Sequence, residues 1–177
     1  KMMTSSFKQP GNHILVVGKT LGHLYQSEFF RVVMNYNDGS PPEINLFNEK
    51  NNGLAVLNLI SKDLVKSVHD ISSGGILLAL SEMCIPNNIG VIINLPKNNI
   101  KLYEYLFGED QSRYIIEISE KNIKEVYKML KEANIYFEEI GKTQKTYMEI
   151  KNKFKKNVND IAKLHKFWFN SYFGENI

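Results

Sequence analysis

Two polar groups of residues interrupt the apolar stretch SVHDISSGGILLALSEMC, which spans residues 67–84. The first is a His-Asp pair, and the second is a Ser-Ser-Gly-Gly run that leads into an apolar segment with helical spacing. Backbone N–H groups at the start of a helix attract anions, and glycines let a ligand approach the backbone closely. The stretch therefore predicts a crevice for a phosphate or a carboxylate, lined by His69, Asp70, Ser72, Ser73, Gly74 and Gly75.

A second concentration of polar residues, GEDQSRY, lies directly before a strand-like segment. Its carboxylates, amide, hydroxyl and guanidinium suit recognition of a polar ligand, or a cation held by oxygen atoms. The alternative is a charged turn in which the arginine pairs locally with a neighbouring carboxylate. We include this group in the predicted crevice as Glu109, Asp110, Gln111, Ser112 and Arg113.

The crevice residues also have a purely structural interpretation, because serine is a common N-cap and Gly-Gly is ordinary turn chemistry. His69 and Asp70 are neighbours on a predicted strand, so they should point to opposite faces and form no dyad with each other. We find no nucleophile motif and no pair of residues at metal-ligand spacing. Gly18-Lys19-Thr20 is no P-loop, because the nearest upstream glycine is too distant. The sequence predicts no catalytic residue and no metal site.

Alternating and helical apolar patterns define the elements that must carry these loops. Strand patterns cover residues 13–19, 63–70, 89–96, 114–119, 135–142 and 147–154, the last as an edge strand. Helical patterns cover residues 46–62, 76–84, 101–107, 120–133 and 157–172, with a weaker one at 21–36. Strands that alternate with helices predict a layered α/β (α+β) domain with a mixed sheet of about four to five strands.

Two of the helices carry specific expectations about their apolar faces. In the helix at 46–62, Leu54, Leu57 and Ile60 or Ser61 fall about one turn apart, as on one face of a helix. In the C-terminal helix, the aromatic run KFWFNSYF is either a stripe that faces the core or a surface that docks on a neighbouring domain. The core-facing stripe is the more frequent arrangement.

The bulk properties fit one globular domain in a reducing compartment. The chain has 177 residues, a formal charge of +3 and one cysteine, with no apolar run of membrane-spanning length and no signal-peptide pattern. We expect a cytoplasmic protein with no membrane contact. Residues 1–10, which lack strand or helix periodicity, are interpreted as a linker from a missing upstream domain, and residues 11–177 as a single domain.

A binding module without enzymatic activity is the alternative from a different functional class. Such a module would bind RNA or a protein through lysines clustered on one exposed face. The 22 basic residues are spread through the sequence, which favours a solvated lysine-rich surface and no nucleic-acid partner.

VHDISSGGILLALSEM, followed by LFGEDQSRYIIEI, resembles the C-terminal domain of phosphoribosylformylglycinamidine synthases, in their synthetase subunit. Further similar segments are FKQPGNHILVVGKT, SEFFRVV, GSPPEINLFNE and EEIGK, so the resemblance covers most of the chain. Two positions depart from the family pattern. Ser73 stands where an aspartate is usual, and Tyr25-Gln26 stands where Gly-Gly is usual.

This resemblance implies a fold like the C-terminal domain of AIR synthase and a place in purine biosynthesis. Such enzymes make formylglycinamidine ribonucleotide from formylglycinamide ribonucleotide, ATP and glutamine-derived ammonia, with Mg²⁺. The implied partners are the upstream domains of the same subunit and the glutaminase and small accessory subunits. The implied catalytic and metal-binding residues belong to the absent domains. The 177 residues alone are therefore expected to be inactive and to bind neither ATP nor Mg²⁺. Aminoimidazole ribonucleotide synthetase, selenophosphate synthetase and thiamine-monophosphate kinase are alternatives within the same superfamily, and GEDQSR argues against them.

Overall fold

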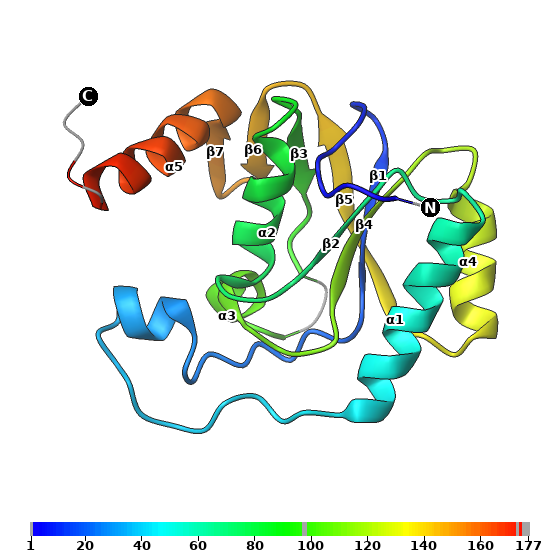
Figure 1. The fold of residues 1–177 in the computed structure, drawn as a ribbon, viewed down its shortest axis with the longest axis horizontal. Coiled ribbons are helices and arrows are strands. Elements are labelled where there is room, and N and C mark those ends of the chain that lie inside the picture. Colours follow the sequence, from blue (N-terminus) through cyan, green and yellow to red (C-terminus); the bar gives the residue numbers. More distant parts are fainter. Residues whose placement is uncertain (1, 97–98, 173, 175–177) are drawn as a thin grey trace.

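The strand predicted after Gly11 forms β1 (His13–Val17), and all of its residues are buried. The computed structural model describes residues 2–96, 99–172 and 174 (Figure 1). The first residue of the predicted linker and the last three of the predicted domain lie outside the described residues, as do 97–98 and 173. A strand that is buried on both faces reads as a continuous apolar run, as β1 does.

The sheet has seven strands in the order β2-β4-β1-β5-β3-β6-β7, and every neighbouring pair is antiparallel except β3 and β6. The strands after β1 are β2 (Ser67–Asp70), β3 (Gly90–Ile93), β4 (Tyr114–Ile118), β5 (Phe137–Gln144), β6 (Tyr147–Ile150) and β7 (Phe154–Asn157). The expected α/β class with a mixed sheet is confirmed. The expected strand number was too low.

The extra strand arises from the segment YMEIKNKF, which was predicted as one edge strand. In the structure this segment turns back on itself, so β6 and β7 pair as antiparallel neighbours. Asn152 lies in the turn with a φ of 61°, a left-handed conformation that asparagine adopts more readily than most residues. The polar run Lys151-Asn152-Lys153 interrupts the alternation at this turn, and it is the signal in the sequence that could have revealed the turn.

Helices cover both faces of the sheet and divide the core in two. The helices α2 (Gly75–Cys84) and α3 (Leu102–Phe107) pack on one face, with Ile14 and Val16 of β1 beneath them. On the other face, α1 (Leu46–Ser61) and α4 (Ile123–Glu132) pack over Leu15 and Val17. Figure 1 shows α2 in front of the sheet and α1 beside α4. Within the described residues, no helix combines the length and the apolar composition that crossing a bilayer requires.

The apolar residues predicted for the helix at 46–62 only partly face the core, because Ile60 packs against it and the two leucines do not. Leu59 and Val56 of α1 are buried against the sheet, whereas Leu57 is 60% exposed and Leu54 is also exposed. The helix carries leucines on more than one side, so apolar spacing alone could not determine which side faces the core.

The C-terminal helix α5 (Val158–Tyr172) also differs from the more frequent arrangement. Its first turns contact the core through the buried Val158 and the partly buried Ile161. Leu164, Phe167 and Trp168 are exposed, so they do not form a stripe that faces this core. In Figure 1 the rest of α5 extends away from the sheet.

The N-terminal segment lies against the domain although it forms no helix or strand. The Phe7 side chain is fully buried, and its backbone N–H donates to the Met83 carbonyl at 3.0 Å. The buried Glu117 carboxylate accepts hydrogen bonds from the backbone N–H groups of Lys8 and Gln9. It also accepts hydrogen bonds from the Asn12 side-chain amide at 2.7 Å and from the Ser67 hydroxyl at 2.8 Å. The segment is thus fixed to the sheet, and its continuation into an upstream domain stays a prediction.

Candidate functional site

The two predicted polar loops meet in space through a carboxylate of the protein itself. Glu109 Oε1 accepts a hydrogen bond from the Gly74 N–H at 2.7 Å and another from the Glu28 N–H at 2.8 Å. Gly75 has a φ of +66°, and a Cβ there would lie 2.7 Å from the Leu106 carbonyl oxygen, so the close approach requires glycine. The Gly74 amide of the predicted anion crevice is therefore already bonded to an internal anion.

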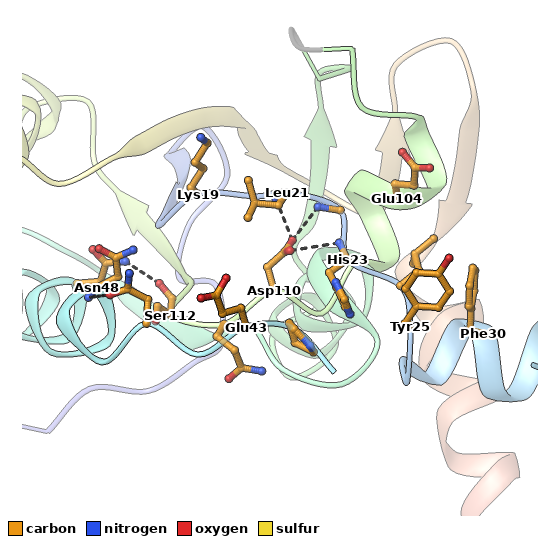
Figure 2. Close-up of a pocket in the computed structure, with 16 residues that line it drawn as sticks. Lys19, Leu21, His23, Tyr25, Phe30, Glu43, Asn48, Glu104, Asp110 and Ser112 are labelled. Carbon is orange, nitrogen blue, oxygen red and sulfur yellow. Dashed lines mark hydrogen bonds between the residues drawn. The ribbon is translucent and has the colours of Figure 1, made fainter. Parts of the chain in front are cut away.

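Asp110 uses its carboxylate to hold the loop that follows β1. It is 5% exposed and accepts hydrogen bonds from the backbone N–H groups of Leu21 at 3.0 Å, Gly22 at 2.9 Å and His23 at 3.2 Å (Figure 2). Successive backbone N–H groups that converge in this way form an anion-binding concavity. In this chain the concavity contains the Asp110 carboxylate.

Arg113 lies beneath this loop and is 1% exposed. Its Nε donates to the Asp110 carbonyl at 2.9 Å, its Nη2 to the Gly108 carbonyl at 2.6 Å and its Nη1 to the Thr20 hydroxyl at 3.2 Å. Burial lowers the pKa of the guanidinium, and the nearby Asp110 carboxylate opposes that shift. The local pairing considered for Arg113 is thus present, but it is buried and not on the surface.

A cavity beside these loops has a volume of about 670 Å³ and is lined by polar and apolar groups in similar measure. Figure 2 shows it between the loop after β1, the start of α1 and the 110–112 turn. Three of the predicted site residues line it, namely Asp110, Gln111 and Ser112. Its other lining residues are Lys19, Leu21, Gly22, His23, Leu24, Tyr25, Phe30, Pro42, Glu43, Asn45, Asn48, Asn52 and Glu104.

The remaining predicted residues lie outside this lining. Ser72 and Ser73 are exposed, and Gly74 and Gly75 are buried against the turn that contains Gly108. Glu109 is bonded to backbone amides, as described above, and Arg113 is buried behind the cavity wall. A ligand role for these residues stays a prediction.

His69 and Asp70 also lie outside the lining, and His69 makes a contact that the sequence interpretation missed. Its Nε2 lies 3.1 Å from Glu82 Oε2, on the facing helix α2. Its Nδ1 donates to the Asp70 carbonyl at 2.7 Å and lies 3.4 Å from Asp70 Oδ1. The expectation that alternation along the strand keeps the two side chains apart was wrong, because Asp70 is the last residue of β2 and its side chain turns back.

Asparagines at the start of α1 form one wall of the cavity. Asn45 caps the helix by accepting the Asn48 N–H at 3.0 Å, and Asn52 Nδ2 donates to the Ser112 carbonyl at 2.8 Å. The Ser112 hydroxyl donates to the Glu49 carboxylate. These bonds fix the 110–112 turn against α1, where Ser112 has a φ of 61°. The polar spacing of NLFNEKNN in the sequence is the signal that could have identified this wall.

Charged and hydrogen-bonding groups of both signs face the cavity. Lys19 is exposed, and within the described part of the chain it has no hydrogen bond or ion pair. His23 Nε2 donates to the Ser40 carbonyl at 2.9 Å, which orients the ring at the rim. Lysine, amide and hydroxyl groups of this kind can bind a polar ligand. The residues that the structure describes contain no group of three or more side chains suited to hold a metal ion.

Comparison with known proteins gives relatives that match almost the whole chain. The chain is 47% identical, over 97% of its length, to the phosphoribosylformylglycinamidine synthase subunit PurL of Pelagibacter ubique. It spans only 23% of the length of that relative.

Solved structures with the same fold are more distant in sequence. T. maritima PurL complexed with FGAR has a TM-score of 0.73 and 20% identity, covering 91% of this chain and 29% of its own. T. maritima PurL complexed with ATP has a TM-score of 0.69, 20% identity and coverages of 91% and 27%. PurLQS from Thermotoga maritima also has a TM-score of 0.69 and 20% identity, with coverages of 90% and 27%. At this identity the likeness concerns the fold.

The family match covers the elements that build the cavity. The family described as AIR synthase related protein, C-terminal domain, matches residues 9–151, which run from the segment before β1 to the end of β6. This confirms the relationship inferred from VHDISSGGILLALSEM and LFGEDQSRYIIEI. The chain therefore belongs to the AIR synthase related proteins, as their C-terminal domain.

Proposed function

We propose that this chain is the C-terminal domain of a phosphoribosylformylglycinamidine synthase, which makes formylglycinamidine ribonucleotide in purine biosynthesis. The observation that carries the proposal is the 47% identity to the Pelagibacter ubique subunit across 97% of the chain. Since the chain spans 23% of that subunit, the larger part of the enzyme lies in other domains. The complete enzyme would use formylglycinamide ribonucleotide, ATP, Mg²⁺ and ammonia from glutamine.

In this proposal the cavity forms one wall of a ligand site that upstream domains complete. The polar groups in its lining and its position beside the loop after β1 support a role in binding. Glu109, Asp110 and Arg113 act beneath it by fixing the loop backbones, as their hydrogen bonds indicate. Lys19 and Gln111 extend from that framework as exposed groups that a ligand can reach.

The proposal extends to cofactors, partners and compartment. T. maritima PurL has been solved with ATP, and a PurLQS structure contains further subunits, which supports ATP use and a multi-subunit assembly. We assign the glutaminase and small accessory subunits as partners of the complete enzyme. We place the protein in the cytoplasm, where purine synthesis occurs. The 177 residues alone would bind neither ATP nor Mg²⁺.

Reconstitution of the longer polypeptide tests the proposal. We expect the longer polypeptide to convert formylglycinamide ribonucleotide when it is supplied with ATP, Mg²⁺ and ammonia, whereas the 177 residues alone show no turnover. Activity of the 177 residues alone would contradict the assignment of the catalytic residues to the upstream domains. Inactivity of the longer polypeptide with all substrates present would contradict the proposed function.

The alternative of an RNA-binding module has one supporting observation. Lys155 and Lys156 of β7 lie near Lys163 of α5 around a shallow surface depression. Calorimetry with an RNA oligomer at two salt concentrations separates the alternatives, because phosphate contacts make binding fall steeply with salt. Tight, salt-sensitive RNA binding would contradict the enzyme interpretation.

A further inference from the structure

One face of α5 is apolar and largely exposed. Leu164, Phe167 and Trp168 are between 63% and 72% exposed. Their spacing is that of a single stripe along a helix, of the kind that inserts into grooves on partner surfaces. Trp168 and Tyr172 stack on each other with ring centroids 5.6 Å apart, which makes the end of the stripe one continuous aromatic surface. In Figure 1 this part of α5 lies beyond the edge of the sheet.

Positive charge flanks the stripe. Lys163 and Lys166 are exposed next to it on α5, and no ion pair involves them within the described residues. Lys155 and Lys156 of β7 lie near the start of the helix, where Lys155 is paired with Glu149 at 3.2 Å. A surface that is apolar along its centre and cationic along one edge is complementary to an apolar groove with carboxylates on its rim. Two copies of the same stripe would instead bring lysines towards lysines.

The extents of the two sequence matches bear on which partner could offer such a groove. The family match ends at residue 151, before α5 begins, so α5 lies outside the matched part of the domain. The alignment to the Pelagibacter ubique subunit covers 97% of the chain and therefore includes most of α5. On the proposed function, α5 belongs to the synthetase subunit but lies outside the matched domain. The remaining 77% of such a subunit is then the part of the same polypeptide that α5 can contact.

We propose that α5 docks, through Leu164, Phe167 and Trp168, into an apolar groove with an acidic rim on another domain of the same polypeptide. This inference rests on the proposed function, because it requires a longer polypeptide. In this arrangement α5 is a clamp that holds the domain in place beside the part of the enzyme that completes the cavity.

Carbodiimide cross-linking of the longer polypeptide tests the acidic rim directly. Carbodiimide joins lysine amines to carboxylates only where they are in contact. We expect products that link Lys163 or Lys166 to an Asp or Glu outside the 177 residues, within a single polypeptide. Products that link two polypeptides would identify a second copy as the occupant and overturn the proposal. Absence of any such product to a carboxylate outside the 177 residues would also overturn it.

Hydrogen exchange of the same longer polypeptide tests the apolar stripe. We expect Trp168→Glu to raise the exchange rate of the α5 backbone amides about tenfold, because a carboxylate cannot enter the groove. The matched control is Asn159→Glu, which adds the same charge at an exposed position near the start of α5 and should leave the exchange of residues 161–172 unchanged. Equal effects of the two variants would overturn the proposal. The proposal would also be overturned if the α5 amides were protected from exchange only after an RNA oligomer or anionic phospholipid vesicles had been added.

Failure of this inference and failure of the proposed function can be distinguished. An active longer polypeptide whose α5 amides exchange as fast as an unprotected helix contradicts only the docking. An inactive polypeptide in which α5 is protected and cross-linked contradicts only the synthase activity.

Discussion

Asp110 and Arg113 show how a motif with a ligand-like composition can act within the protein. The carboxylate holds the backbone of the loop after β1, and the guanidinium holds two carbonyls and a hydroxyl beneath it. Both groups are buried, and a buried charge without its partner would lower the stability of the fold. This pair therefore determines the shape of the cavity more than it contributes to its surface.

Substitution of Asp110 tests this role. We expect Asp110→Ala to lower the free energy of unfolding by about 3 kcal/mol, because it leaves backbone amides unpaired and removes the carboxylate beside a buried cation. Urea unfolding followed by circular dichroism measures the change. Gln111→Ala is the control, because Gln111 is exposed on the same turn, and it should change stability by less than about 0.5 kcal/mol. Equal effects at the two positions would contradict the structural role.

Gly75 provides a second test at this scale. An alanine there would combine a φ of +66° with a Cβ 2.7 Å from one carbonyl oxygen and 2.8 Å from another. We expect Gly75→Ala to cost about 3 kcal/mol of unfolding free energy. Gly11→Ala is the matched control, because Gly11 has a φ of +93° but open space around its Cβ position. That control should cost only about 1 kcal/mol, and a similar cost for both variants would exclude the close approach as the cause.

Apolar patterns in the sequence located most helices and strands, because the residues that face the core recur with the period of the helix or strand that carries them. Strands β1, β3 and β4 are strongly apolar and were placed near their observed positions, and the helix at 76–84 coincides with α2 apart from its first residue. The patterns failed where the decisive contact is distant in sequence. The Gly74 amide is bonded to Glu109, and Ser112 is bonded to Asn52, partners that no local spacing indicates. Thirteen of the sixteen residues that line the cavity were missed.

Substitutions on the two sides of α1 test which side packs against the sheet. We expect Leu59→Ala, which empties a fully buried position, to cost about 3 kcal/mol of unfolding free energy. Leu57→Ala on the 60% exposed side should cost less than about 1 kcal/mol. Chemical denaturation of the two variants measures both values. The reverse order would mean that the originally predicted face packs on the sheet.

At the scale of the whole molecule, a cluster around His13 makes stability depend on pH. The Glu139 carboxylate accepts a hydrogen bond from the Tyr127 hydroxyl, and His13 Nδ1 lies 2.6 Å from it. Burial by itself raises the pKa of Glu139, but the bonds from Tyr127 and His13 outweigh it, and the pKa lies below its ordinary value of 4.5. The folded protein therefore favours the ionised carboxylate more than the unfolded chain does. Glu139 therefore stabilises the folded state at any pH above its pKa in the unfolded chain. This stabilisation is lost as the pH falls through the lower pKa that Glu139 has in the folded protein.

Glu139→Gln tests this dependence. We expect the variant to lose less unfolding free energy than the wild type between neutral pH and about pH 3, because the neutral amide has no proton to take up. Urea unfolding across that range measures the two slopes. Glu125→Gln, at an exposed position on α4, should retain the wild-type slope. A slope for Glu139→Gln equal to that of the wild type would exclude this carboxylate as a source of acid sensitivity.

The anchoring of the N-terminal segment connects the two halves of the core. Met3 is partly buried against the cluster that contains Leu15 and Val17, and the Thr4 carbonyl accepts a hydrogen bond from the Val68 N–H at 3.3 Å. Phe7 is fully buried in the cluster on the other face of the sheet. A segment without helix or strand structure thus contacts both helical layers, and detachment of either layer would free one part of it.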